Sequence, residues 1–130
     1  MDSFASLRAW IAGAGGMIGG YLGNIDSPLY ALLAFMATDY VTGVLCGIAE
    51  RSLSSSIGFR GICRKVYILA LVGVANTLDI HVIGGGSVIR TTVIFFYISN
   101  EGISILENAE RIGLPIPEKV RDVMKQLKNK

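Results

Sequence analysis

The chain has 130 residues, of which 52% are hydrophobic and only 17% are charged. Its mean hydropathy of +0.53 exceeds that of ordinary soluble domains of this size. The charges are scarce in the apolar stretches and denser at 50–65 and 110–130, a distribution typical of a membrane protein. The net charge of +2 says little by itself. We expect a single membrane domain over 1–130 and no nucleic-acid partner.

The first apolar stretch, residues 4–25, has the three- and four-residue spacing of a helix. It is rich in glycine, and Gly16 and Gly20 follow Ala12 on one narrow face that favours close helix packing. It reaches the roughly 20 residues that a spanning helix needs, although strongly apolar residues are few. The stretch is predicted either to span the bilayer or to lie in the interface with Trp10 and Tyr21 at headgroup level.

The second stretch carries a single acid at its centre. Residues 26–28 form a helix-start signal, and the helix predicted after it covers 28–49 with Asp39 in the middle. A mid-helix Asp costs about 2.5–3.5 kcal/mol on insertion, which the large apolar residues of the helix nearly offset. The helix is therefore predicted to span with Asp39 turned away from lipid. Gly43 and Gly47 share the face of Asp39 and predict close packing against another helix.

The remaining segments alternate between polar and apolar. Residues 50–65 are predicted to be a polar loop, and their basic residues, among them Arg64 and Lys65, place it in the cytoplasm. Spanning helices are predicted at 66–83 and 88–107, joined outside by Gly84–Gly86. With both basic segments inside, the N-terminus lies outside if the first stretch does not span and inside if it does.

A short amphipathic helix is predicted at 118–128, on the cytoplasmic side, after the helix-breaking segment 113–117. Its cationic side consists of Lys119, Arg121, Lys125 and Lys128. This basic side has three interpretations: a solvated surface, a topology signal, or attraction to anionic lipids.

Depth along the predicted helices brings their polar residues to one level. At 1.5 Å per residue, Asp39, Asn76 and the pair Asn100 and Glu101 fall within about one turn of a common plane. We predict a polar layer there, either inside a protomer or between protomers. Tyr97, Glu101, Ser104 and Asn108 share one helix face.

No cation is expected at this level, because Arg64, Lys65 and Arg90 are assigned to helix ends. Hydrogen bonds to protonated carboxyls are then expected in place of salt bridges. Two interpretations of the acids remain equal: they hold helices together, or they line a pore or act as a trigger. Asp79, near the outer end of its helix, is expected to be solvated at the interface.

Chemistry of the enzymatic kind is not predicted. The sequence has no phosphate-binding glycine loop, metal-ligand set or nucleophile–base pair, and its glycine-rich segment 13–20 follows no strand as a dinucleotide site would. We expect no cofactor and no bound metal.

Five short motifs occur in order along the chain. They are Asp39-Tyr-Val-Thr-Gly43; Gly61-Ile-Cys-Arg64-Lys65; Asn76-Thr-Leu-Asp79; Tyr97-Ile-Ser-Asn-Glu101 with Ser104-Ile-Leu-Glu-Asn108; and Gly113-Leu-Pro-Ile-Pro117 before the basic helix. In this order, from about Pro28 to Lys128, the chain resembles the phage lysis and toxin-secretion holins of Gram-positive bacteria and their phages.

The resemblance implies an all-α integral membrane protein of the bacterial cytoplasmic membrane that forms homo-oligomers among membrane lipids. Such a protein opens lesions at a set time, and these release an endolysin to the cell wall or let a large toxin cross. An antiholin is the implied regulatory partner. Two alternatives stay open: a small ion channel or transporter with Asp39 and Glu101 as a relay, and an antiholin-like inhibitor that makes no lesion itself.

Overall fold

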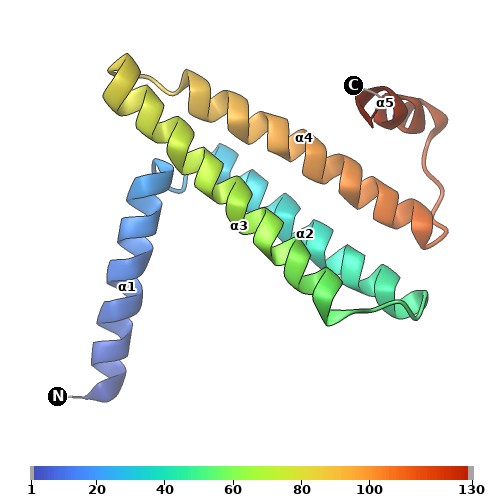
Figure 1. Cartoon of the computed structure of the whole chain (residues 1–130), viewed down its shortest axis with the longest axis horizontal. Coiled ribbons are helices and arrows are strands. Elements are labelled where there is room, and N and C mark those ends of the chain that lie inside the picture. The colour runs from blue at the N-terminus through green and yellow to red at the C-terminus, as the bar shows by residue number, and fades with distance from the viewer. Residues whose placement is uncertain (1, 129–130) are drawn as a thin grey trace.

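The computed structural model describes residues 2–128, in which every regular element is helical (Figure 1). The elements are α1 (Ser3–Leu22), α2 (Ser27–Ala49), α3 (Ser55–Thr77) with its π-helical continuation η1 (Leu78–Ile83), α4 (Val88–Arg111) and α5 (Glu118–Lys128). Two segments, Ser27–Ala49 and Ser55–Ile83, are long and apolar enough to cross a membrane. The predicted all-helical class is confirmed; the third predicted span, now part of α4, carries more polar residues and does not meet the same criterion.

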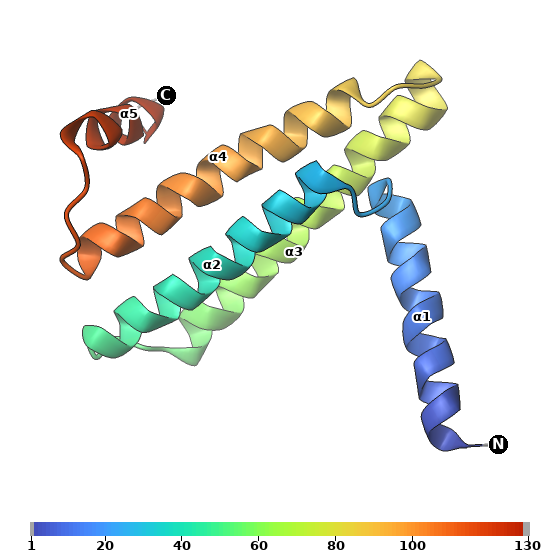
Figure 2. The ribbon, with the colours of Figure 1, turned by 180° about the vertical axis from the view of Figure 1, so that it is seen from behind.

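Helices α2, α3 and α4 lie side by side as an antiparallel bundle (Figures 1 and 2). Their apolar core occupies the half of the bundle next to the start of α2. It consists of Leu22, Leu29, Leu32, Met36, Ile68, Val72 and Ile94. In a bilayer these side chains stabilise the bundle by close van der Waals packing. The other half of the bundle has a polar interior and holds the site described below.

The helix starts follow local capping chemistry. The side chain of Asp26 accepts the backbone N–H of Leu29 at 3.2 Å, and the side chain of Ser54 accepts that of Ile57 at 3.5 Å. Both contacts satisfy N–H groups that lack a partner within the first helical turn. The start signal predicted at 26–28 therefore marks the beginning of α2.

The predicted loop 50–65 is wrong. Only residues 50–54 connect the helices, and α3 already begins at Ser55. Arg64 and Lys65 lie within this helix, and Lys65 is about 15 Å from its start at 1.5 Å per residue. The polar composition of this segment suggested a loop, whereas in the structure Lys65 reaches the polar interior of the bundle and Arg60 is exposed on the helix. Helix α4 likewise continues to Arg111, beyond the predicted end at 107.

The prediction of a solvated Asp79 is also wrong. Its residue is 1% exposed, and its carboxylate accepts the backbone N–H groups of Ile89 at 3.1 Å and Arg90 at 2.8 Å. The π-helical turn η1 and the glycine turn after it bring the acid under the first turn of α4. An anion at a helix N-terminus satisfies free N–H groups and complements the helix dipole.

Helix α1 projects away from the bundle (Figures 1 and 2). It is held at its last turn, where the Tyr21 ring lies over Gly73 so closely that any side chain there would overlap it. The Tyr21 hydroxyl also donates to the carbonyl of Ala70 at 3.1 Å. Around Gly16 and Gly20 there is open space, so the small-residue face predicted for helix packing is uncovered in this chain.

Helix α5 has the predicted bounds and lies beside the far end of α4 (Figure 1). Met124 is buried, and Arg121 Nε is 3.4 Å from Glu110 Oε1. Lys119 and Lys125 are exposed, while the side chain of Lys128 lies outside the described part of the chain.

Candidate functional site

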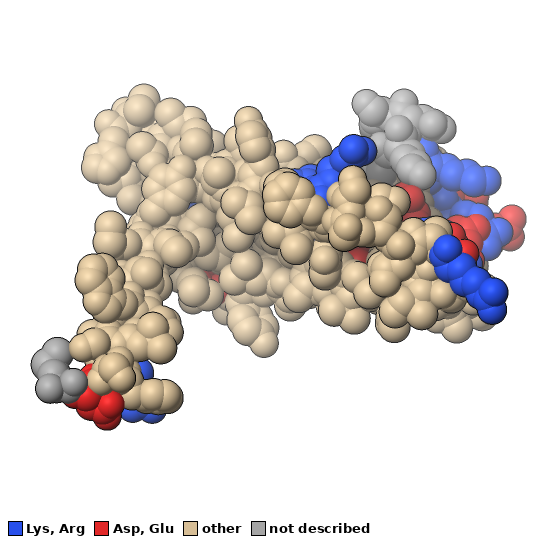
Figure 3. Space-filling model, turned by 60° about the horizontal axis from the view of Figure 1, so that its bottom comes forward, with Lys and Arg blue, Asp and Glu red and all other residues tan. Residues whose placement is uncertain are grey.

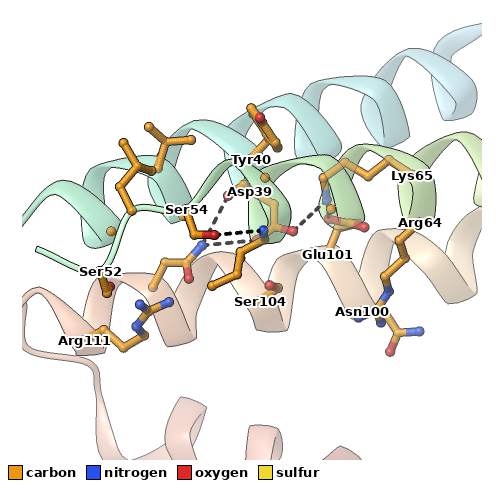
Figure 4. Close-up of a pocket in the computed structure, with 18 of the residues that line it drawn as sticks. Asp39, Tyr40, Ser52, Ser54, Arg64, Lys65, Asn100, Glu101, Ser104 and Arg111 are labelled. Atoms are coloured by element: carbon orange, nitrogen blue, oxygen red, sulfur yellow. Dashed lines mark hydrogen bonds and ion pairs between the residues drawn. The ribbon is translucent and has the colours of Figure 1, made fainter. Parts of the chain in front are cut away.

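The polar half of the bundle contains three charged side chains in direct contact, one from each helix. Lys65 Nζ of α3 donates to Asp39 Oδ2 of α2 at 2.7 Å and to Glu101 Oε2 of α4 at 2.8 Å (Figure 4). The three side chains are 6–16% exposed. We call Asp39, Lys65 and Glu101 the triad. The interaction joins all three helices of the bundle.

The expectation that this depth holds no cation is wrong, because α3 begins earlier than predicted and carries Lys65 into the bundle. Salt bridges to Lys65 therefore take the place of the expected hydrogen bonds between protonated carboxyls and Asn76 or Asn100. The net stabilisation by a buried ion pair is small, since desolvation of the charges offsets their attraction. Removal of one partner is costly, at about 3–5 kcal/mol, because the other charge stays buried without compensation.

Asn108 completes the surroundings of Asp39. Its Nδ2 donates to Asp39 Oδ1 at 3.1 Å, to the Asp39 carbonyl at 3.2 Å and to Thr42 Oγ1 at 2.9 Å. The Cys46 thiol donates to the Asn108 carbonyl at 3.1 Å. Asn108 was not among the predicted polar-layer residues, although its spacing of two turns from Glu101 placed it on the same face. The two carboxylate oxygens of Asp39 thus contact different helices.

The other members of the predicted polar layer lie elsewhere. Asn76 Nδ2 donates to the Tyr21 carbonyl at 3.1 Å, near the opposite end of the bundle from the triad. Its predicted depth is wrong because it was counted from a helix start that is eleven residues too late. Asn100 is half-buried and faces the same cavity as the triad, but it lies apart from Asp39 (Figure 4).

A second polar cluster holds the turn between α1 and α2 against α4. Arg90, 4% exposed, donates from Nε to the Leu22 carbonyl at 2.6 Å and from Nη2 to the Asn24 carbonyl at 2.9 Å. Its Nη1 and Nη2 contact the Asp26 carboxylate at 2.7 and 3.1 Å. We call Asn24, Asp26, Asn76 and Arg90 the junction cluster.

This junction needs glycine at position 23, where φ is +87° and an added side chain would collide with both Arg90 and Asn76. The left-handed backbone and the close approach each favour glycine. The hydrogen bonds from Arg90 hold the pKa of Asp26 below its ordinary value. Sequence reasoning missed this cluster, because its main acceptors are backbone carbonyls.

Beside the triad lies a cavity of about 280 Å³, walled by α2, α3, α4 and the loop 50–54. Gly43, Gly47, Gly58 and Gly61 help to make room for it. Gly43 lies next to Asn108 and Gly47 next to Leu53. Both glycines predicted for helix packing therefore face the interior of this chain.

The charged residues are separated from the apolar ones over the surface. Lys, Arg, Asp and Glu gather toward the end of the bundle that carries α5, and at the N-terminal tip of α1 (Figure 3). The face between them is formed mainly by other residues. Exposed side chains on the helices include Phe95 and Phe96 of α4, Val66 and Tyr67 of α3, and Leu45 of α2.

An all-helical chain with two helices apolar enough to span, and with its central charges paired inside a bundle, is a helical membrane protein by class. The comparison with family models then identifies the chain more closely. It belongs to the bacteriophage holin family, whose model matches residues 16–129. The resemblance seen in the motifs is thereby confirmed, and the chain has a holin-like role. Members of this family are not enzymes in general.

Similar proteins occur in several Gram-positive bacteria. An uncharacterized 14.9 kDa protein in the nagH 3' region of Clostridium perfringens is 45% identical over 98% of this chain and 89% of its own length. The uncharacterized protein Lmo0128 of Listeria monocytogenes is 39% identical over 91% of this chain and 84% of its own length. YtkC of Bacillus subtilis is 29% identical over 100% and 96%. No solved structure matches the chain significantly.

Proposed function

We propose that the protein is a holin that assembles into homo-oligomers in the bacterial cytoplasmic membrane and forms lesions there. The lesions let an endolysin, or a large toxin, cross the membrane and so set the time of lysis. Family membership supports this function. The observation that carries it is the triad, three charges held inside a bundle whose outward surface is largely apolar.

In this proposal α4 is a third spanning helix. It runs parallel to α2 and antiparallel to α3, and it has nearly the same length as α2, 24 against 23 residues. Its charged Arg90 and Glu101 are buried toward the other helices, so its lipid-facing side is more apolar than its average composition. The basic end of the bundle and α5 then lie in the cytoplasm under the positive-inside rule.

Helix α1 is the proposed contact between copies. Its apolar side chains, such as Trp10 and Met17, are exposed, and the face with Gly16 and Gly20 is open. Small residues let helices approach closely in a bilayer, where packing rather than hydrophobicity drives association. The helix serves this role whether it spans the membrane or lies in the interface.

In the closed protomer the charges of the triad are kept inside the bundle, away from lipid, until lesions open. Within one protomer each charge has a partner, so the closed bundle is compatible with lipid. An oligomer whose helices part along the α3–α4 side would turn the same residues toward water. The polar residues of the interior would then line the lesion, and the apolar outer surface would stay in lipid.

Inducible expression in a bacterium, together with a cytoplasmic endolysin, tests the function. The expected result is a delay, then collapse of the membrane potential and release of the endolysin. The control is a culture of the same cells to which no inducer is added. Selective ion flux without passage of folded protein would instead support a small channel or transporter. Delayed lysis on co-expression with a lesion-forming holin, and no lesion alone, would support an antiholin.

A further inference from the structure

We propose that the cavity beside the triad is a water-filled vestibule, open at the basic end of the bundle and closed at its other end by the apolar core. It admits small hydrophilic cations from one side of the membrane as far as the triad. This inference deepens the proposed function and rests on the membrane placement given there. It concerns the closed protein, before any lesion forms.

Polar side chains follow the cavity from its loop end to the triad, among apolar ones such as Val44, Leu53 and Ile57. Ser52 and Arg111 lie at the loop end, Ser104 lies further in, and Asp39 and Lys65 lie beyond it (Figure 4). From residue 54 to residue 65 the helix rise gives a depth of about 16 Å. A cavity of about 280 Å³ has room for several water molecules, and the serine, asparagine and charged side chains along it offer them polar partners.

The inner end of the cavity is closed. Ile68 lines it there, and Ile68 and Met36 are 4% exposed while Ile94 is fully buried. These side chains belong to the apolar core that fills the other half of the bundle. Close-packed apolar side chains leave no voids that water could occupy. Access to the triad is therefore expected from one end only.

The charges of the triad itself favour a cation. Two carboxylates, Asp39 and Glu101, share the single ammonium of Lys65, so the triad has a formal excess of one negative charge. Arg111 at the mouth is bound by both oxygens of Glu50, at 3.0 and 3.2 Å. Arg64 also lines the cavity, but it is exposed and lies away from Asp39 (Figure 4). A buried excess charge is stabilised by water or by a mobile counter-ion.

Two serines of α4 offer a matched test. Ser104 lines the cavity, whereas Ser99 is exposed on the helix surface that the proposal places in lipid. Each is changed to Cys in a chain whose own cysteines are replaced (Cys46→Ser, Cys63→Ala). Membrane vesicles of both orientations, still retaining a trapped dye, are treated with membrane-impermeant cationic and anionic thiol reagents. Val72→Cys reports on the apolar core.

The expected result is that Ser104→Cys reacts in one vesicle orientation only, and that Ser99→Cys and Val72→Cys react in neither. The cationic reagent should react with Ser104→Cys about tenfold faster than the anionic one, a difference of about 1.4 kcal/mol, because the excess negative charge of the triad attracts it. An equal rate for the two reagents would overturn the cation preference. No reaction at Ser104→Cys, or reaction from both sides, would overturn the vestibule.

The same experiment separates this inference from the proposed function. One-sided labelling of Ser104→Cys in a protein that never releases endolysin would keep the vestibule and reject the holin role. Lysis without labelling at this position would do the reverse. If Ser99→Cys reacts faster than Ser104→Cys, the outer surface of α4 is in contact with water and not with lipid. That order would reject the membrane placement of α4 and the vestibule with it.

Discussion

The two polar clusters of the bundle solve the problem of buried charge differently. In the junction cluster one arginine donates to two backbone carbonyls and a carboxylate, and a close-packed glycine turn leaves no room around it. In the triad one lysine is shared by two carboxylates, and a cavity lies beside it. The first arrangement fixes a turn in one geometry. The second leaves an excess of charge and space, as a site that rearranges requires.

The largest expected effect comes from removal of the shared cation. Lys65→Met leaves Asp39 and Glu101 buried without a partner and should lower the free energy of unfolding by about 3–5 kcal/mol. Equilibrium unfolding in mixed detergent micelles measures this loss. The triple change Asp39→Asn, Lys65→Met and Glu101→Gln removes all charge and should recover most of the stability. A loss below about 1 kcal/mol for Lys65→Met would show that the triad is not desolvated.

The junction cluster should respond to a change that keeps the charge. Arg90→Lys retains the cation but cannot reach the carbonyls of Leu22 and Asn24 and the carboxylate of Asp26 together. With acceptors left unsatisfied, the expected loss is about 2–4 kcal/mol. Arg64→Lys, at an exposed arginine, serves as the control and should cost almost nothing. Equal effects of the two changes would contradict the role assigned to Arg90.

Asp39→Asn tests the triad by a smaller step. The amide keeps the shape of the side chain but weakens its interaction with Lys65, which should cost about 1.5–3 kcal/mol. Insertion should be retained, while the stability of the oligomer and the time of lysis change. Crosslinking and lysis curves of induced cultures report both. Unchanged crosslinking together with unchanged timing would remove Asp39 from the mechanism.

The contact between α1 and α3 allows a comparison of two glycines. Gly73→Ala forces the Tyr21 ring away from α3 and should cost about 1–3 kcal/mol. Gly16→Ala meets open space within the chain and should leave the isolated protomer at least as stable. Quenching of Trp10 fluorescence and the rate of proteolysis near residue 24 follow the release of α1. If Gly16→Ala releases the helix as strongly, the Tyr21 contact is not what holds it.

The smallest effect is expected from acid. Because the pKa of Asp26 is lowered in the folded protein from 3.8, its ionised form stabilises the fold at and above that pH. The contribution is lost as the pH falls below 3.8 through the lowered value. Thermal unfolding between pH 2 and 7 should therefore show a weaker acid dependence in Asp26→Asn than in the unchanged chain. The same pH profile for both proteins would contradict the linkage.

The helical class and the interior position of two triad residues could be predicted from the sequence. An acid within a long apolar run is costly in lipid, so Asp39 and Glu101 indicate an interior site on composition alone. Lys65 was missed because the polar segment 50–65 was predicted to be a loop. Only the tertiary structure shows that the bundle has a polar interior in which this lysine lies. The depth assigned to Asn76 failed with the same helix boundary.

Other contacts could not be predicted from any pattern in the sequence. The Asp79 carboxylate reaches N–H groups ten and eleven residues further along the chain through a π-helical turn. The acceptors of Arg90 are mostly carbonyls, which every residue possesses. Such contacts depend on the tertiary path of the backbone and leave no characteristic residue spacing.

Because α1 is attached to the bundle at one end only, a small rotation there moves its other end a long way. Its 20 residues extend about 30 Å from the Gly23 turn, and the described contacts with the bundle lie at its last turn. A rotation of about 10° at that pivot moves the far tip by about 5 Å, by simple geometry on that length. A small repacking of Arg90, Asn76 or Tyr21 therefore gives a large displacement at the surface of α1 that is proposed to contact another copy.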